Sequence, residues 1–158
     1  MRKVFRSLLT VILLSVGALA VVGSSAQASS QAVKLTLTLD AVNPITGTAT
    51  GDPDATGTAV FKLYPQSGKI CYKIKVRGLD APIEPAPGVG DAHIHAVSTG
   101  AIVVDLDTDF RRADGYYIAT GCVTTSPEVV AAILANPTAY YLNIHNAPYP
   151  GGALFAVL

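Results

Sequence analysis

The sequence predicts an all-β fold, an antiparallel β-sandwich or a partly closed barrel, with one short helix near residues 127–135. Three observations lead to this prediction. Many short segments alternate apolar and polar residues, which is the period of a half-buried strand. Turns rich in Gly and Pro separate these segments. A single segment, late in the chain, carries the start and stop signals of a helix.

The strand segments are short and closely spaced. The first, at residues 33–39, alternates strictly and would bury every second side chain on one face. Further strands are predicted at residues 58–64, 70–77, 91–96, 101–106, 116–123, 139–146 and 152–158. We expect loops at residues 80–90, which hold three prolines and two glycines, and at the polar residues 107–115.

The predicted helix has a defined beginning and end. Ser126 is a residue type that accepts hydrogen bonds from the free N–H groups of a first turn, and Pro127 suits the first helical position. Glu128 would place a negative charge beside the positive end of the helix dipole. Because Pro137 disfavours helical geometry in the residue before it, we expect the helix to end by residue 135.

The first 28 residues have the pattern of a cleaved signal peptide. Three basic residues are followed by an apolar run over residues 8–22 and by small residues that fit a cleavage site after Ala28. The run is shorter than the roughly 20 residues that span a membrane, so we expect no membrane anchor after cleavage. Residues 29–158 would then form a single secreted β domain, either extracellular or periplasmic.

Loss of the signal peptide would change the charge balance. The whole chain has 11 basic and 11 acidic residues, and removal of the three basic residues at positions 2, 3 and 6 leaves eight against 11, a net charge of −3. Nucleic acids and anionic membranes attract basic proteins. The net charge therefore argues against both as partners, and the partner expected is an unidentified protein or small ligand.

Cys71 and Cys122 are the only cysteines in the sequence. An even number of cysteines in an exported chain predicts a disulfide, with two free buried thiols as the alternative. Cys71 is in phase with the lysines of residues 70–77 and not with the apolar residues. We therefore expect the bridge at the rim or on the outer face of its sheet.

All three histidines of the chain lie in two strand-like segments. His93 and His95 are two residues apart and would point to the same side of one strand. His145 shares a face with Tyr141 and Asn143 in a second strand. If the two strands are neighbours, three imidazoles converge, and three nitrogen ligands with an open position suit one copper or zinc ion.

Three nearby polar residues would support such a site. Asp91 is in phase with His93 and would accept a hydrogen bond from a ligating imidazole, while Asn143 and Tyr141 would lie beside His145. The alternative is a structural cluster, in which the imidazoles bond to backbone carbonyls or to a tyrosine and hold no metal.

The sequence gives less support to a calcium site or a catalytic serine than to the histidine site. Asp105, Asp107 and Asp109 alternate as calcium ligands do, but Phe110 occupies the place of the glycine in an EF-hand loop. A solvated strand end and turn is the interpretation that we favour for these aspartates. The serines show no nucleophile-elbow pattern, so the sequence predicts no catalytic residues and leaves enzymatic activity open.

Several motifs in combination resemble the CHRD domain, a module named for the repeats of chordin and also found in many secreted bacterial proteins. They are Ala92-His93-Ile94-His95, Gly121-Cys122-Val123, and the block from Ile133 to Leu154 with Tyr140-Tyr141, Asn143-x-His145 and Pro150-Gly151-Gly152. The resemblance covers roughly residues 33–158. It implies a β-sandwich similar to immunoglobulin or superoxide dismutase domains, and no particular reaction. Because a dinuclear dismutase needs six histidines, three exclude that activity.

The chain departs from the resembled pattern near its end. Asn146 replaces the usual threonine, and residues 152–158 lack the usual arginine and glutamine and are apolar on both faces. We expect this strand to be buried or covered by a partner, for example in an oligomer.

The sequence thus predicts a secreted CHRD-type module with a binding or structural role. The alternative is a mononuclear copper or zinc protein that uses His93, His95 and His145.

Overall fold

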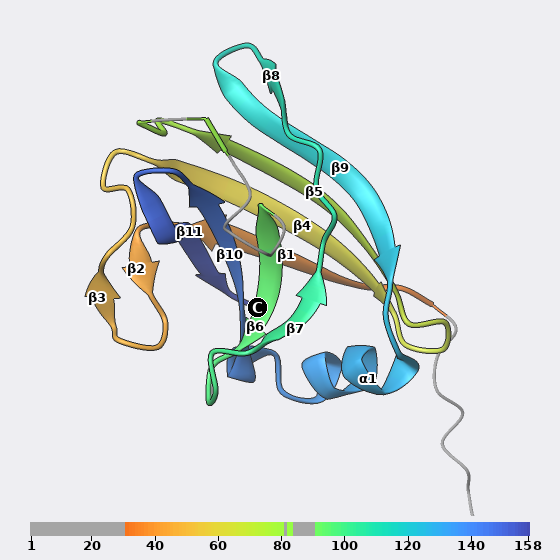
Figure 1. Cartoon of the computed structure of the whole chain (residues 1–158). Coiled ribbons are helices and arrows are strands. Elements are labelled where there is room, and N and C mark those ends of the chain that lie inside the picture. Colours follow the sequence, from red (N-terminus) through yellow and green to blue (C-terminus); the bar gives the residue numbers. More distant parts are fainter. Residues whose placement is uncertain (1–30, 81, 84–90) are drawn as a thin grey trace, which may run out of the picture.

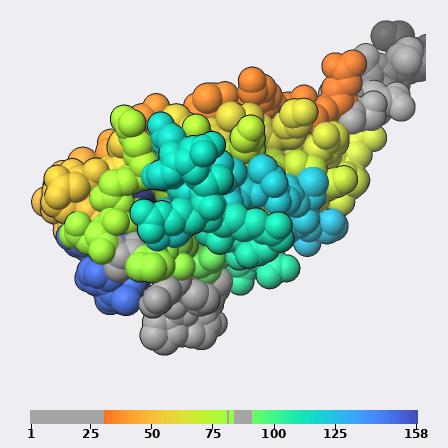
Figure 2. All heavy atoms as spheres, turned by 90° about the horizontal axis from the view of Figure 1, so that it is seen from above, coloured from red at the N-terminus to blue at the C-terminus, as the bar shows by residue number. Residues whose placement is uncertain are grey.

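Two antiparallel sheets pack face to face in the computed structural model, which describes residues 31–80, 82–83 and 91–158 (Figure 1). In the space-filling view of Figure 2, the orange residues of the first strand run along the upper edge of the molecule, and the blue C-terminal residues lie at the lower left. The all-β sandwich prediction is therefore confirmed. The predicted signal peptide, residues 1–28, and most of the predicted loop at 80–90 lie outside the described residues.

The larger sheet, sheet A, has five strands in the order β1-β4-β5-β9-β8. Their bounds are β1 Val33–Leu39, β4 Thr56–Tyr64, β5 Lys69–Arg77, β8 Arg111–Ala113 and β9 Tyr116–Thr124. All neighbouring strands are antiparallel. Phe61 and Ile74 are fully buried toward the second sheet, whereas Lys62 and Lys73 are exposed on the outer face. This alternation is the one that the sequence predicts.

The smaller sheet, sheet B, has four strands in the order β11-β10-β6-β7. Their bounds are β6 Ala92–Ala96, β7 Ile102–Asp105, β10 Tyr140–Asn146 and β11 Tyr149–Val157. Ile94, Leu142 and Ile144 are fully buried and belong to the core between the sheets. Their strand neighbours at odd-numbered positions, which include the histidines, therefore point away from sheet A.

A short hairpin of β2 Val42–Asn43 and β3 Thr48–Ala49 lies next to the C-terminal strand. Two backbone hydrogen bonds, of 3.0 and 2.8 Å, join Asp40 to Phe155, and the Asp52 N–H donates to the Ala153 carbonyl over 2.9 Å. Residues 153–156 are buried within the same chain, as their apolar character predicts. Association with a second copy through this strand stays a prediction.

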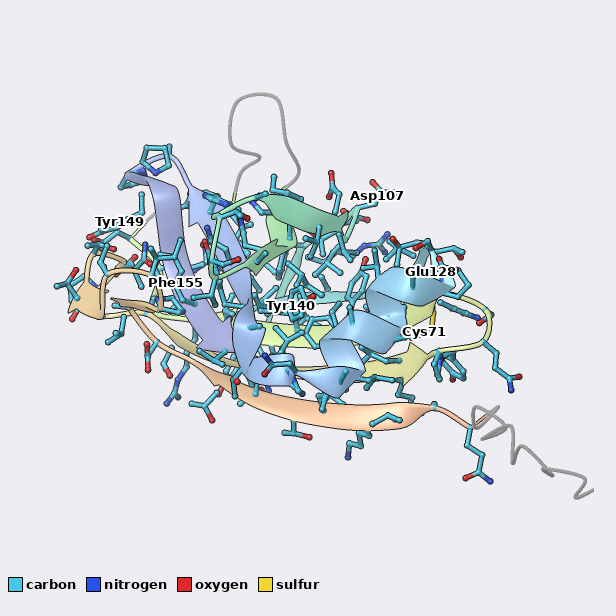
Figure 3. The ribbon with its side chains drawn as sticks, turned by 90° about the horizontal axis from the view of Figure 1, so that it is seen from below. Cys71, Asp107, Glu128, Tyr140, Tyr149 and Phe155 are labelled. Carbon is cyan, nitrogen blue, oxygen red and sulfur yellow. A yellow bond between two sulfur atoms is a disulfide. The ribbon has the colours of Figure 1, made fainter. Side chains whose placement is uncertain are left out.

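One end of the sandwich is closed by α1 Pro127–Ala135, followed by a 3-10 turn at Pro137–Ala139 (Figure 3). The Ser126 hydroxyl accepts a hydrogen bond from the Val129 N–H over 3.3 Å, which confirms the predicted cap. Val130 and Ile133 are the buried residues of this helix and belong to the core. None of the helices in the described part of the chain is sufficiently long and apolar to span a membrane.

Cys71 and Cys122 form a disulfide between β5 and β9, where they are directly paired in register. Cys122 is exposed, and both residues alternate with core residues of their strands. The bridge therefore lies on the outer face of sheet A, as predicted from its phase with the lysines.

The sequence did not predict three short strands, β2, β3 and β8. Their residues are exposed or half-buried, so no buried apolar position marks them in the sequence. The predicted polar loop at 107–115 contains β8, which forms a hairpin with β9. The last strand begins at Tyr149 and not at Gly152, because Tyr149 already pairs with Asn146 across a tight turn.

Candidate metal centre

The two histidine-bearing strands, β6 and β10, are direct antiparallel neighbours in sheet B. His95 is paired with Tyr141 and His93 with Asn143. The backbone N–H of His145 donates to the Asp91 carbonyl over 3.0 Å, which continues the pairing by one more step. Paired residues project to the same side of a sheet. The condition on which the predicted site depends, that the two strands are neighbours, is therefore met.

This histidine face is buried although it points away from sheet A. The exposed fractions are 1% for His93, 4% for His145 and 9% for His95. Buried polar groups in proteins are normally hydrogen-bonded. The contacts of each imidazole nitrogen therefore decide what the cluster can do.

The three imidazoles converge on one small volume. Each offers one nitrogen, and these three atoms all lie within 4.8 Å of one another. The Nε2 atoms of His93 and His145 are 2.8 Å apart. The ring centroid of His93 lies 4.7 Å from that of His95 and 4.6 Å from that of His145. Within the described ranges, this is the only group of three or more His, Cys, Asp or Glu side chains placed to share one metal ion.

Backbone carbonyls fix the tautomer of two of the imidazoles. His95 Nδ1 lies 2.7 Å from the Gly100 carbonyl oxygen, and His145 Nδ1 lies 2.9 Å from that of Pro150. A carbonyl oxygen only accepts, so each Nδ1 carries the proton and donates it. Each Nε2 then carries a lone pair directed into the cluster, and that of His145 faces His93 Nε2. This arrangement, with the outer nitrogen bonded to a carbonyl, is typical of metal-ligating histidines.

Both acceptors come from the hairpin that contains the histidine itself. Gly100 follows His95 by five residues in the β6–β7 hairpin, and Pro150 follows His145 by five in the β10–β11 hairpin. Gly100 has a φ of +68°, a left-handed conformation that favours glycine in its turn. Neither acceptor is predictable from the sequence, because a backbone carbonyl leaves no residue-type signature.

Two buried nitrogens of the cluster have no hydrogen-bond partner. They are His93 Nδ1 and His95 Nε2, and this statement covers residues 31–80, 82–83 and 91–158. In the absence of a metal, the neutral His93 can donate from Nε2 to His145, which leaves its own Nδ1 lone pair unused. Hydrogen bonds among the described residues therefore leave the cluster unsatisfied. A cation bound by the Nε2 lone pairs would satisfy His95 Nε2, and His93 would then carry its proton on Nδ1.

The imidazoles are neutral at neutral pH in this arrangement. Burial, with the nearby His145 and His95, lowers the pKa of His93 from 6.5 to about 4. Burial also lowers the pKa values of His95 and His145, although the hydrogen bonds that they donate to the Gly100 and Pro150 carbonyls act in the opposite direction. A neutral imidazole is the form that binds a metal.

Of the three residues predicted to support the site, Tyr141 contacts an imidazole, whereas Asn143 and Asp91 bond to other groups. The Tyr141 ring stacks on His95 with 4.9 Å between centroids and an interplanar angle of 8°. Asn143 donates from Nδ2 to the Gly151 carbonyl over 3.3 Å, and its buried Oδ1 has no partner within the described residues. The Asp91 carboxylate accepts from the Thr108 hydroxyl. Backbone carbonyls accept from His95 and His145, whereas His93 Nδ1, the imidazole nitrogen nearest in phase to Asp91, has no acceptor among the described residues.

Gly152 and Phe155 complete the site and were not predicted to belong to it. Gly152 has a φ of +128°. A methyl group at this position would overlap the Asn143 side-chain oxygen and the Phe155 ring. The Pro150-Gly151-Gly152 motif thus allows the turn to approach Asn143 closely.

The acidic cluster predicted as a solvated turn begins next to the histidine cluster, because Asp105 is the strand partner of His93. Asp105, Asp107 and Asp109 are all exposed. Asp105 accepts from the Asp107 N–H over 3.1 Å, and Asp109 pairs with Arg111 at 3.0 Å. The exposure of all three side chains, at and after the end of β7, agrees with the interpretation favoured from the sequence.

The residues present fit a small transition-metal ion. Metal–nitrogen bonds of about 2.0–2.1 Å place two ligating nitrogens roughly 2.9–3.4 Å apart at angles of 90–110°. The 2.8 Å between the Nε2 atoms of His93 and His145 is close to that range. A small movement of these rings would accommodate the ion, and His95 Nε2 would supply the third bond.

Comparison with known proteins gives one family. No curated protein and no solved structure matches the chain. The family model of the CHRD domain matches residues 33–154, which include both sheets, the disulfide and all three histidines. The match covers well over half of the chain, so this protein belongs to the CHRD domain family.

Proposed function

We propose that this protein is an exported CHRD module that binds one copper or zinc ion through His93, His95 and His145. The observation that carries the proposal is the set of three buried, converging imidazoles, two of which have their Nδ1 atoms bonded to backbone carbonyls. The unpartnered His95 Nε2 adds to it, because burial of an unsatisfied acceptor is unfavourable.

The ligand set favours copper or zinc over other common cations. Three imidazoles offer neutral nitrogen donors, which suit zinc and copper, whereas calcium and magnesium prefer oxygen ligands. Three protein ligands leave a position open on the metal, as in catalytic zinc centres.

Export is part of the proposal and has separate support. The first 28 residues have signal-peptide composition, and Cys71 and Cys122 form a disulfide, which persists in oxidising compartments. A secreted protein would meet copper and zinc outside the cytoplasm. The expected test of export is that the mature protein isolated from the native host begins at residue 29.

The metal is tested by elemental analysis of mature protein that carries no histidine tag. We expect one equivalent of copper or zinc after growth with both metals, and loss of it in His95→Gln and in His145→Gln. Competition between the two metals, with electron paramagnetic resonance of the copper-loaded form, distinguishes them. Coordination by imidazole nitrogens would appear as nitrogen hyperfine structure.

Ile144→Val is the matched control. It changes the strand that carries His145, but its side chain lies in the core on the opposite face. This variant should retain the metal. Protein that stays free of metal under these conditions, or binds it equally in His95→Gln, would favour the structural cluster held by the His93–His145 hydrogen bond.

A further inference from the structure

We infer that the outer face of sheet A binds a linear anionic polysaccharide. This inference is independent of the metal centre, which lies on the outer face of the other sheet. Seven basic side chains carry it: Lys34, Lys62, Lys69, Lys73, Lys75, Arg77 and Arg111. We call this surface the basic face.

The strand register places all seven on one side. Residues paired across neighbouring strands project to the same side of a sheet. Lys34 is paired with Lys62, and Lys62 with Cys71 of β5. On the other side of β5, Lys75 is paired with Ile118, and Ile118 with Arg111. In β5 the basic residues alternate with the buried core residues Ile70, Tyr72, Ile74 and Val76. Alternate residues of a strand share a face, so β5 alone presents a row about 27 Å long.

The charge of the protein is strongly segregated. The described ranges hold eight basic residues, of which only Arg112 does not belong to the basic face. None of the five strands of sheet A contains an aspartate or glutamate. Asp107, by contrast, lies on the other side of the molecule from β1 (Figure 3). A chain predicted to be acidic overall therefore presents one uniformly basic surface.

These charges are largely uncompensated. Arg111 is paired with Asp109 at 3.0 Å, and this is the only ion pair among the described residues. Lys75 Nζ lies 3.7 Å from the centre of the Tyr116 ring, and the Arg77 guanidinium lies 5.8 Å from it. Like charges held close together repel, which an anionic ligand would relieve.

The other side chains of the basic face suit a carbohydrate. Exposed threonines at positions 36, 38, 56, 58 and 120 lie among the basic residues and offer hydroxyl groups. Thr38, Thr56 and Thr58, with Lys75, Arg77 and Tyr116, line a shallow hollow of about 330 Å³. Together they offer cations for carboxylate or sulfate groups and hydrogen-bonding groups for sugar hydroxyls.

The same surface fits a nucleic acid or a membrane less well. Single-stranded nucleic acids stack successive bases on aromatic rings, but Tyr116 is already covered by Lys75, and the other tyrosine in phase with these lysines, Tyr64, has Lys69 Nζ 5.9 Å from its ring centre. The exposed large apolar residues are Val33, Val42, Ile45, Ile102 and Val157, and none alternates in phase with the basic residues of sheet A. The described part of this face therefore has no exposed large apolar side chain to insert into a bilayer.

The test measures binding of mature protein to polygalacturonate at low ionic strength, with EDTA present to remove metal effects. We expect salt-sensitive binding that falls at least about tenfold in the triple variant Lys62→Gln/Lys73→Gln/Lys75→Gln. Arg112→Gln, which removes a basic residue outside the basic face, should change affinity by less than about twofold. Circular dichroism would verify that each variant remains folded.

Three comparators define the outcomes that would overturn the inference. They are poly-L-glutamate, oligo-deoxythymidine and vesicles containing phosphatidylglycerol. Tighter binding to any of them than to polygalacturonate assigns the face to an acidic protein, a nucleic acid or a membrane. Absence of binding to polygalacturonate, or equal binding by the triple variant, also overturns it.

Discussion

The backbone carbonyls of Gly100 and Pro150 determine the chemistry of the histidine cluster. By accepting the Nδ1 protons of His95 and His145, they leave both Nε2 atoms as lone-pair donors within the cluster. Without these hydrogen bonds, the His95 and His145 rings could rotate, and their Nε2 atoms would not be held toward the cluster. Two of the three nitrogens that the proposed metal would use are therefore already oriented toward the cluster in the folded chain.

The buried neutral histidines should make the metal-free protein sensitive to acid. The pKa of His93 is about 4 in the folded protein and 6.5 for an unperturbed histidine, so the unfolded chain binds the proton first as pH falls. Stability is thus lost between about pH 6.5 and pH 4, by up to about 3 kcal/mol from His93 alone. Above pH 6.5 this contribution is constant. Urea unfolding with EDTA, at several pH values, measures it.

His93→Gln is the comparison for this prediction, because it removes one titrating group. Its stability should depend less steeply on pH in this interval than that of the wild type. Burial raises the pKa of Asp91, which acts in the opposite direction, but that group is present in both proteins. Parallel pH profiles for the two proteins would contradict the burial of a neutral His93.

Gly152→Ala should destabilise the protein by about 2–4 kcal/mol. The φ of +128° disfavours a side chain, and the methyl group would overlap Asn143 and Phe155. Gly151→Ala is the matched control, because nothing lies within 4 Å of the added carbon. It should change stability by about 0.5 kcal/mol or less. Chemical denaturation of both variants measures the difference, and equal effects would show that residue 152 is not tightly enclosed.

At the scale of elements, each hairpin of sheet B acts as a unit of the site. The β6–β7 hairpin contributes His95 with its acceptor Gly100, and the β10–β11 hairpin contributes His145 with Pro150. The pairing of β6 with β10 then joins the two units. A register slip of one residue would turn the histidines toward the core and Ile94 toward the outer face.

The disulfide should stabilise the sandwich without affecting the metal centre. Cys71 and Cys122 are 51 residues apart in sequence, and closure of such a loop contributes about 4 kcal/mol in the loop-entropy description. The double variant Cys71→Ser/Cys122→Ser should lose stability of this order in denaturation experiments. Because the bridge lies on the outer face of sheet A, folded variant protein should still bind one metal equivalent. Loss of the metal from folded protein would contradict the separation of the two features.

At the scale of the whole molecule, charge distribution matters more than net charge. The predicted net charge of −3 argues against polyanionic partners, yet nearly all basic residues of the described chain lie on one face. Residues that are scattered in the sequence gather there because the period of a strand assigns them all to the solvent side of sheet A. An average over the sequence does not detect such a surface.

Metal binding should also stabilise the whole fold. A ligand that binds only the folded state, at 100 times its dissociation constant, adds about 2.7 kcal/mol. For a domain of this size, the unfolding midpoint should rise by roughly 5–15 °C on addition of copper or zinc. Differential scanning calorimetry measures this shift. His145→Gln should show no shift, and an equal shift in that variant would place the binding elsewhere.

Much of the fold was predictable from short-range patterns. Strict alternation located β1 and the core face of β5, and Ser126 and Pro127 marked the beginning of α1. The short strands β2, β3 and β8 were not predictable, because exposed residues carry no burial pattern. For the site, the sequence identified the three histidines, but not the residues that orient or enclose them.

The sequence by itself determined the all-β class, the disulfide partners and the phase that places His93 and His95 on one side of a strand. These properties depend on residue type and on the two-residue period of a strand, which are local. The tertiary structure decided that β6 and β10 are neighbours, that carbonyls orient the imidazoles, and that the lysines form one surface. Those properties depend on contacts between residues far apart in the chain, and local periodicity cannot specify such contacts.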